Sequence, residues 1–173
     1  MSRWLPWTLI GLLTSLPLAA FDLQSDAPIS VSADNARLDD AQGVATYTGD
    51  VVVTQNQTQL TADRVVLYRD AEGLKRIEAF GDPARYQQPA TAEQAETRAR
   101  AKTIIYAARE SQITFREEAV IEQGANLFRG EHILYDTAER IVTAEGGETD
   151  DGSRGRVEMI IQPNQPSGTG NQP

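Results

Sequence analysis

Short runs in which apolar and polar residues alternate follow one another from Ile29 to Ile161. The runs are rich in Val, Ile, Thr, Tyr and Phe, and turn-forming stretches such as "DDAQG" and "DAEG" separate them. A period of two places successive side chains on opposite faces of an extended chain, so that one face can be buried while the other meets water. The pattern therefore predicts an antiparallel all-β domain.

One phrase occurs four times within these runs. Its copies are centred on a small residue and are separated by 29, 39 and 29 residues, at Ala33, Ala62, Ala101 and Gly130. Apolar or small residues lie two positions before each centre and three and five positions after it. The apolar residues, which we expect to face inward, therefore occupy alternate positions of one parity before the centre and of the other parity after it. A strand can change parity in this way and still bury one face only if it contains a bulge. We expect this bulge at the charged residue that follows each centre, namely Asp34, Asp63, Lys102 and Glu131.

The repeat also predicts the architecture. Each unit is a pair of strands about 30 residues long, and such units bury their apolar faces by stacking on their neighbours. The segment Thr91–Lys102 is rich in good helix formers. Because the third copy of the phrase requires a strand there, we expect at most a short helical turn over Ala92–Glu96.

The two ends of the chain differ from the repeats. Residues 1–20 contain one cation, Arg3, then an apolar run and small residues, which is typical of a cleaved signal peptide. A membrane anchor is the alternative, but prolines interrupt the run and it is short for the about 20 residues of a membrane span. We expect an N-terminal tail over 21–28, the β domain over 29–162 and a disordered tail over 163–173, which is composed of turn formers and polar residues.

The composition excludes several kinds of chemistry. The net charge of −9 argues against nucleic acid, which requires a basic face. With one histidine and no cysteine, the chain cannot supply a zinc site or a Cys-His pair, so we expect no metal and no cofactor. His132 has the parity opposite to that of Ile133 and Tyr135, which predicts that it lies on the outer face. Adjacent acids in predicted turns are typical of solvated charge rather than of catalysis.

Four segments of the chain resemble the OstA-like family of lipopolysaccharide transport proteins. They are "PISVSAD" (28–34), "YTGDVVVTQ" (47–55), "LTADRVVLYR" (60–69) and "GDPARYQQ" (81–88). The similarity covers about Pro28–Pro163 and weakens after Glu118, where Glu117 occupies a position that is usually glycine in the family. The resemblance implies an open, V-shaped antiparallel β-jellyroll of about sixteen short strands in repeated strand-pair units.

The same resemblance implies a function without catalysis. Copies of a periplasmic protein would stack head to tail into a homo-oligomeric bridge from LptC at the inner membrane to LptD at the outer membrane. Lipopolysaccharide would travel through an apolar groove that binds the lipid A acyl chains. The end strands Ile29–Ala33 and Val157–Ile161 fit such stacking because they carry few of the charges and prolines that guard an edge.

The residues that line this groove are predicted from the inward parity of the repeats, with two additions, Ile29 and Tyr86, that rest on the resemblance. The predicted lipid-binding residues are Ile29, Val31, Leu38, Leu67, Tyr86, Ile104, Tyr106, Phe115, Phe128, Ile133 and Tyr135.

Two alternatives remain open: a periplasmic glycan-acting β-sheet enzyme with a pair of acids, and a purely structural β-repeat protein. Both tryptophans, Trp4 and Trp7, lie in the predicted signal peptide, which disfavours a sugar-stacking cleft. The lining of the concave face discriminates among these readings.

Overall fold

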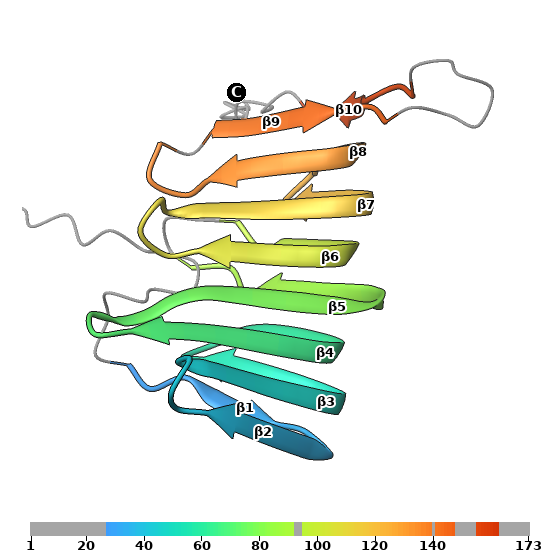
Figure 1. Cartoon of the computed structure of the whole chain (residues 1–173). Coiled ribbons are helices and arrows are strands. Elements are labelled where there is room, and N and C mark those ends of the chain that lie inside the picture. The colour runs from blue at the N-terminus through green and yellow to red at the C-terminus, as the bar shows by residue number, and fades with distance from the viewer. Residues whose placement is uncertain (1–26, 92–94, 140, 148–154, 163–173) are drawn as a thin grey trace, which may run out of the picture.

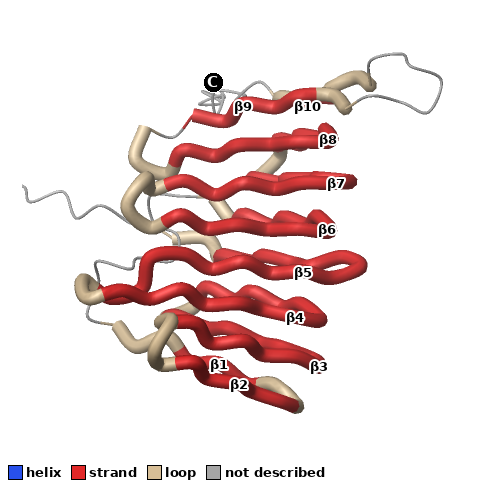
Figure 2. Tube along the Cα trace, viewed as in Figure 1, coloured by secondary structure: helices blue, strands red, loops and turns tan. Residues whose placement is uncertain are grey.

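The computed structural model describes residues 27–91, 95–139, 141–147 and 155–162. The predicted signal peptide, the C-terminal tail, most of the N-terminal tail and most of the expected helical turn lie outside these ranges. Within them every regular element is a strand, which confirms the all-β fold class (Figures 1 and 2). No helix in the described ranges is long and apolar enough to cross a membrane.

The described residues form ten strands that pair antiparallel in one open sheet. Figure 1 shows them stacked nearly in chain order, from the blue end of the molecule to the red end. Their bounds are β1 (Ser30–Ser32), β2 (Asn35–Asp39), β3 (Val44–Gln55), β4 (Thr58–Asp70), β5 (Gly73–Gln88), β6 (Thr97–Ala107), β7 (Gln112–Gln123), β8 (Asn126–Asp136), β9 (Ile141–Glu145) and β10 (Glu158–Ile160).

The six long strands, β3 to β8, each pass through a bend near the middle, and Figure 2 shows β5 turning back at the right of the view. Residues on the two sides of the bend pair separately. On one side β1 pairs with residues 52–54 of β3, and β10 with residues 127–129 of β8. On the other side β2 pairs with residues 44–48 of β3, and β9 with residues 132–136 of β8. The sheet therefore has a first wing, bounded by β1 and β10, and a second wing, bounded by β2 and β9.

The expected number of strands needs correction. The resemblance implies about sixteen short strands, whereas the described residues form ten. Six of the ten contribute one segment to each wing, so that counting segments gives sixteen. The backbone continues through the bend with extended residues on both sides, and the turn-forming stretches "DDAQG" and "DAEG" lie at hairpin ends.

The bulges lie where the repeat predicts them, but the extra residues lie on the partner strands. Register shifts face Asp63, Lys102 and Glu131. The additional residues are Gly49–Asp50 in β3, Gly81–Pro83 in β5 and Glu117–Glu118 in β7. Four of these residues, Gly49, Asp50, Glu117 and Glu118, have positive φ, between 39° and 84°. This left-handed conformation lets the strand turn. The fourth predicted position, Asp34, lies between β1 and β2, where its backbone N–H donates to the Gly49 carbonyl.

The segment that is rich in helix formers becomes a strand from Thr97 onward. Strand β6 lies between β5 and β7 and pairs with both along most of its length. Its inward side chains, among them Ala99, Ala101 and Ile104, are buried. The backbone pairing on two sides and the burial of one face outweigh the local helix propensity, which is at most some tenths of a kcal/mol per residue.

Candidate functional site

The facing sides of the two wings are lined by apolar side chains from every strand. In the second wing one inward row, read across the sheet by its pairing, is Leu38, Ala45, Leu67, Ile77, Tyr106, Ile113, Tyr135 and Val142. The row nearer the bend is Ala36, Tyr47, Val65, Ala79, Ile104, Phe115, Ile133 and Ala144. Each row runs the full length of the array, so the interior has the same apolar character from one end to the other.

The first wing supplies a matching surface. Its main inward row is Val31, Val53, Leu60, Tyr86, Ala99, Ile121, Phe128 and Met159. Nearer the bend the paired inward residues are small: Val51 with Ala62, Ala84 with Ala101, and Ala119 with Gly130. Buried residues of both wings belong to one hydrophobic cluster. Small side chains beside the bend allow the two wings to approach each other closely there, and larger ones such as Tyr86 and Phe128 lie farther out.

All eleven residues predicted to line the interior face it or border it, and they differ in burial. Seven of them are buried: Leu67, Tyr86, Ile104, Tyr106, Phe115, Phe128 and Ile133. Ile29, Val31 and Tyr135 are partly buried and pack against the cluster. Leu38 is 60% exposed, because it lies on the edge strand β2 and has no neighbouring strand beyond it.

Several inward residues of equal burial were not among those predicted. They include Val53, Leu60, Val65, Ile77, Ile113 and Ile121. Leu60 and Val65 already lie within the second copy of the repeated phrase, at its inward parity. The others belong to the second strand of each pair. On that strand, alternation shows which residues face inward once its pairing with the strand that carries the repeated phrase is known.

The middle of the interior is closely packed in the single chain. Val65, Ile77, Phe115 and Ile133 are at most 1% exposed, because side chains of the opposite wing cover them. At the end formed by β1 and β2 the interior opens into a cavity of about 480 Å³. Its lining is mainly apolar and includes Ile29, Val31, Leu38, Tyr47 and Leu67. The interior is therefore accessible from this end, whereas in the middle a guest molecule has to separate the wings.

Three tyrosines from the two wings approach one another inside. Burial raises the pKa of the Tyr86 phenol, and the nearby Tyr135 and Tyr106 raise it further. Tyr86 belongs to the first wing and the other two to the second, so the phenols influence one another across the interior. The Tyr86 hydroxyl donates to Oε1 of Gln88 at 3.1 Å. These phenols and the amide bring polar groups to the side of the interior that lies away from the bend.

The outer face carries the polar chemistry. His132 lies in an outward row between Arg116 and Glu145, and its Nδ1 is 3.6 Å from a Glu145 carboxylate oxygen, which confirms the predicted orientation. Arg98 and Arg100 form ion pairs with Glu96 and Glu122. In the described ranges no three His, Cys, Asp or Glu side chains are grouped so that they could hold a metal ion.

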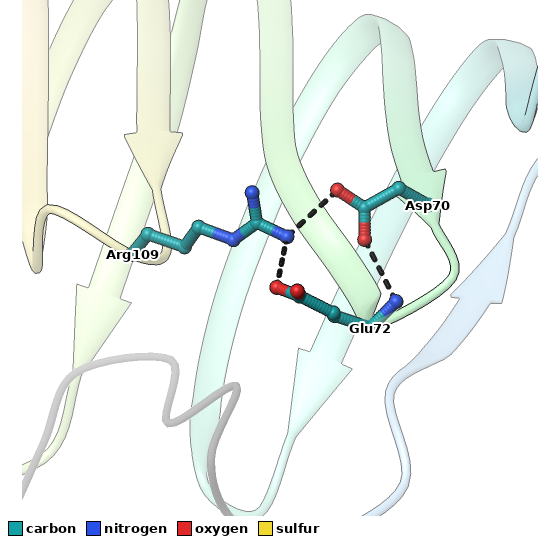
Figure 3. Close-up of polar contacts among 3 residues, drawn as sticks. All are labelled: Asp70, Glu72 and Arg109. Atoms are coloured by element: carbon teal, nitrogen blue, oxygen red, sulfur yellow. Dashed lines mark hydrogen bonds and ion pairs between the residues drawn. The ribbon is translucent and has the colours of Figure 1, made fainter.

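The acids of the turns are engaged with arginine rather than placed in a cleft. Nη2 of Arg109, in the β6–β7 turn, lies 2.8 Å from Oδ2 of Asp70 and also pairs with Glu72 (Figure 3). The backbone N–H of Glu72 donates to Oδ1 of Asp70 at 2.9 Å. The three side chains tie two adjacent hairpins together at the surface, where ion pairs contribute little to stability. A carboxylate pair bound to one guanidinium in water lacks the two different environments that acid–base catalysis needs.

Both ends of the array present exposed apolar residues. At one end Leu38 is exposed on β2. At the other end exposed apolar side chains lie on β9 and on or beside β10: Ile141, Val157, Met159, Ile160 and Ile161. The outer edges of these four short strands have no strand paired to them in the described part of the chain. Each end thus offers one free strand edge per wing.

Comparison with known proteins identifies relatives over most of the chain. The family described as "LptA/(LptD N-terminal domain) LPS transport protein" matches residues 30–141. The lipopolysaccharide export system protein LptH of Pseudomonas aeruginosa is 42% identical over 149 residues, which cover 83% of this chain and 85% of that protein. The lipopolysaccharide export system protein LptA of Haemophilus influenzae is 30% identical over 152 residues, which cover 85% of each chain.

A solved structure agrees with the fold. The crystal structure of LptH from Pseudomonas aeruginosa, described as the LptA-homologous periplasmic component of the lipopolysaccharide transport device, superimposes with a TM-score of 0.71. The match has 42% sequence identity and covers 79% of this chain and 96% of that one.

Proposed function

Because the chain belongs to the family of lipopolysaccharide transport proteins that comprises LptA and the N-terminal domain of LptD, we propose that it binds lipopolysaccharide in the periplasm and carries it toward the outer membrane. The observation that carries this proposal is the uninterrupted apolar lining of both wings, from β1 and β2 to β9 and β10. It supports acyl-chain binding, because each methylene moved from water into an apolar site contributes about 0.8 kcal/mol. The predicted groove residues are the proposed lipid contacts.

The close packing of the interior supports a particular route of lipid entry. The cavity beside Ile29, Val31 and Leu38 supports entry of acyl chains at the end formed by β1 and β2. Farther along, the chains replace contacts between the wings, so that apolar surface stays covered in both states. Such an exchange has a small net free energy, which suits a carrier that has to release its cargo.

The free edges support head-to-tail assembly. If β10 of one copy pairs with β1 of the next, and β9 with β2, both wings continue across the junction and so do their apolar rows. The two ends differ in sequence, so this pairing is heterologous and extends into a filament rather than closing into a dimer. Partners with the same fold, LptC at the inner membrane and LptD at the outer membrane, would cap the ends by the same strand addition.

A catalytic role has no support in the interior. Its lining in the described ranges is apolar at the middle of both wings, and the carboxylates lie in turns and on the outer face. The relatives are named as export proteins. We therefore assign transport without catalysis, in preference to the glycan-acting and purely structural readings.

Site-specific photo-crosslinking in cells tests the proposal. Ile133 is buried and faces the interior, whereas its neighbour Leu134 faces outward between Thr114 and Thr143. A photo-crosslinker at Ile133 or Tyr106 should capture lipopolysaccharide, and one at Leu134 or Arg64 should capture much less. Equal capture at Ile133 and Leu134, or no capture at any inward position in folded protein, would overturn the proposed function.

A further inference from the structure

In the first wing, each of the six long strands has a polar, uncharged residue at the inward position farthest from the bend. These six residues, which we name the amide–hydroxyl row, are Gln55, Thr58, Gln88, Thr97, Gln123 and Asn126. Pairing aligns them across the sheet: Gln55 with Thr58, Gln88 with Thr97, Thr97 with Gln123, and Gln123 with Asn126. No Lys, Arg, Asp or Glu interrupts the row.

The row faces the interior at its mouth. Each member lies two positions from a residue of the main apolar row, such as Leu60, Tyr86 or Phe128, and therefore shares its face. Each is also farther from the bend than that residue, next to a hairpin or loop. Gln55, Thr58 and Thr97 are only 3%, 7% and 7% exposed. The interior is thus apolar in its depth and lined by amides and hydroxyls along one rim.

Two of these side chains bond to the protein itself, since Nε2 of Gln55 donates to the Ala27 carbonyl and Oε1 of Gln88 accepts from the Tyr86 hydroxyl, both at 3.1 Å. Strand formation does not require the threonines. Valine has the shape of threonine and suits a strand as well, and a buried hydroxyl costs free energy unless it is hydrogen-bonded. Nε2 of Gln123 donates to Oγ1 of Thr97 at 3.3 Å. Glutamine can make four hydrogen bonds in all, so Gln123 has capacity left for a ligand.

We propose that the amide–hydroxyl row contacts the sugar portion of the amphiphile whose acyl chains occupy the apolar rows; this inference rests on the proposed function. Amides and hydroxyls both donate and accept, as sugar hydroxyls and sugar amides do. Phosphate groups are bound by arginine and lysine, which the row lacks. The chemistry of the row therefore selects the saccharide and not its phosphates.

The geometry of the row suits a moving ligand. Neighbouring strands are about 4.8 Å apart, so six segments span about 24 Å along the array. Equivalent donors and acceptors recur at each step. A sugar that leaves one strand finds similar partners on the next, while its acyl chains remain among the apolar rows.

The test compares two probes on the full mature chain. One probe is lipopolysaccharide, and the other is a fluorescent fatty acid, which has an acyl chain but no sugar. The variant is the double substitution Thr97→Val and Gln123→Leu, which keeps size and removes the polar atoms. The matched control is Thr114→Val, the same chemical change on the outward face of β7.

We expect the double variant to bind lipopolysaccharide about three- to tenfold more weakly, the effect of one or two lost hydrogen bonds, and to bind the fatty acid as the parent does. Thr114→Val should leave both affinities unchanged. Unchanged lipopolysaccharide affinity in the double variant, or an equal loss for both probes, overturns the role of the row. Failure of the parent protein to bind either probe overturns the proposed function instead.

Discussion

Replacing Leu38 by aspartate should abolish self-association and leave the single chain folded. Leu38 lies on edge strand β2 at the end of an inward apolar row, and it is 60% exposed when no other copy is present. The exposed carboxylate in Leu38→Asp therefore meets water in the single chain. A surface substitution of this kind changes stability by about 0.5 kcal/mol or less.

The cost arises only in the assembly. If β2 pairs with β9 of the next copy, Leu38 joins the row that ends in Val142 and becomes buried. Full burial of a leucine contributes about 1.5–3 kcal/mol. Because Leu38 is 60% exposed in the single chain, its burial in the assembly would contribute about 1–2 kcal/mol, and this contribution is lost in Leu38→Asp. Burial of the carboxylate adds at least about 2 kcal/mol. The sum, about 3 kcal/mol or more, corresponds to at least about a hundredfold weaker association.

Sedimentation velocity over a range of concentrations measures this effect, with thermal unfolding as the check on folding. The matched control is Ile141→Asp. Ile141 is 56% exposed on the other terminal strand, β9, but it lies in the outward row opposite Asp136. Its substitution should leave association nearly unchanged. The end-to-end pairing would be refuted by a folded Leu38→Asp protein that associates like the parent, or by an equal loss in both variants.

Two further predictions follow from the same structure. Deletion of residues 156–173 removes β10 and should leave a folded monomer that neither self-associates nor pulls down its outer-membrane partner; an unchanged oligomer distribution would contradict the role of that edge. Phe115→Ala removes a side chain that is 1% exposed where the wings meet, and it should lower the free energy of unfolding, measured by urea titration, by about 3–5 kcal/mol. Leu134→Ala on the outer face should lower it clearly less. Equal losses in the two variants would mean that the assigned faces are wrong.

Much of the inward surface could be predicted from the sequence. Period-two alternation in "TADRVVLYRD" places Val65 and Leu67 on one face of a strand whatever it pairs with, because side chains of an extended chain alternate. The same reasoning oriented Ile104, Ile133 and His132 correctly. The family resemblance, carried by four short segments, agrees with the match over residues 30–141.

Local patterns could not give the continuity of the strands. The change of parity in the repeated phrase indicates where the strands bend. It does not indicate which of two paired strands contains the extra residues. Glu117 and Glu118 adopt positive φ in β7, although glutamate does not favour that conformation. Pairing with β8 and burial of the inward side chains on both sides of the bend impose it, and these forces come from other parts of the chain.

Alternation along the chain already identifies the apolar face of each strand, because it is a local property of the extended backbone. What those faces meet depends on the tertiary structure. It brings Tyr86 to Tyr106 and Tyr135 across the interior, packs Ile77, Phe115 and Ile133 without an open channel in the middle, and aligns Thr97 with Gln88 and Gln123 in one polar row. The physical reason is that register and the approach of the two wings depend on contacts between residues far apart in the chain, which no local period encodes.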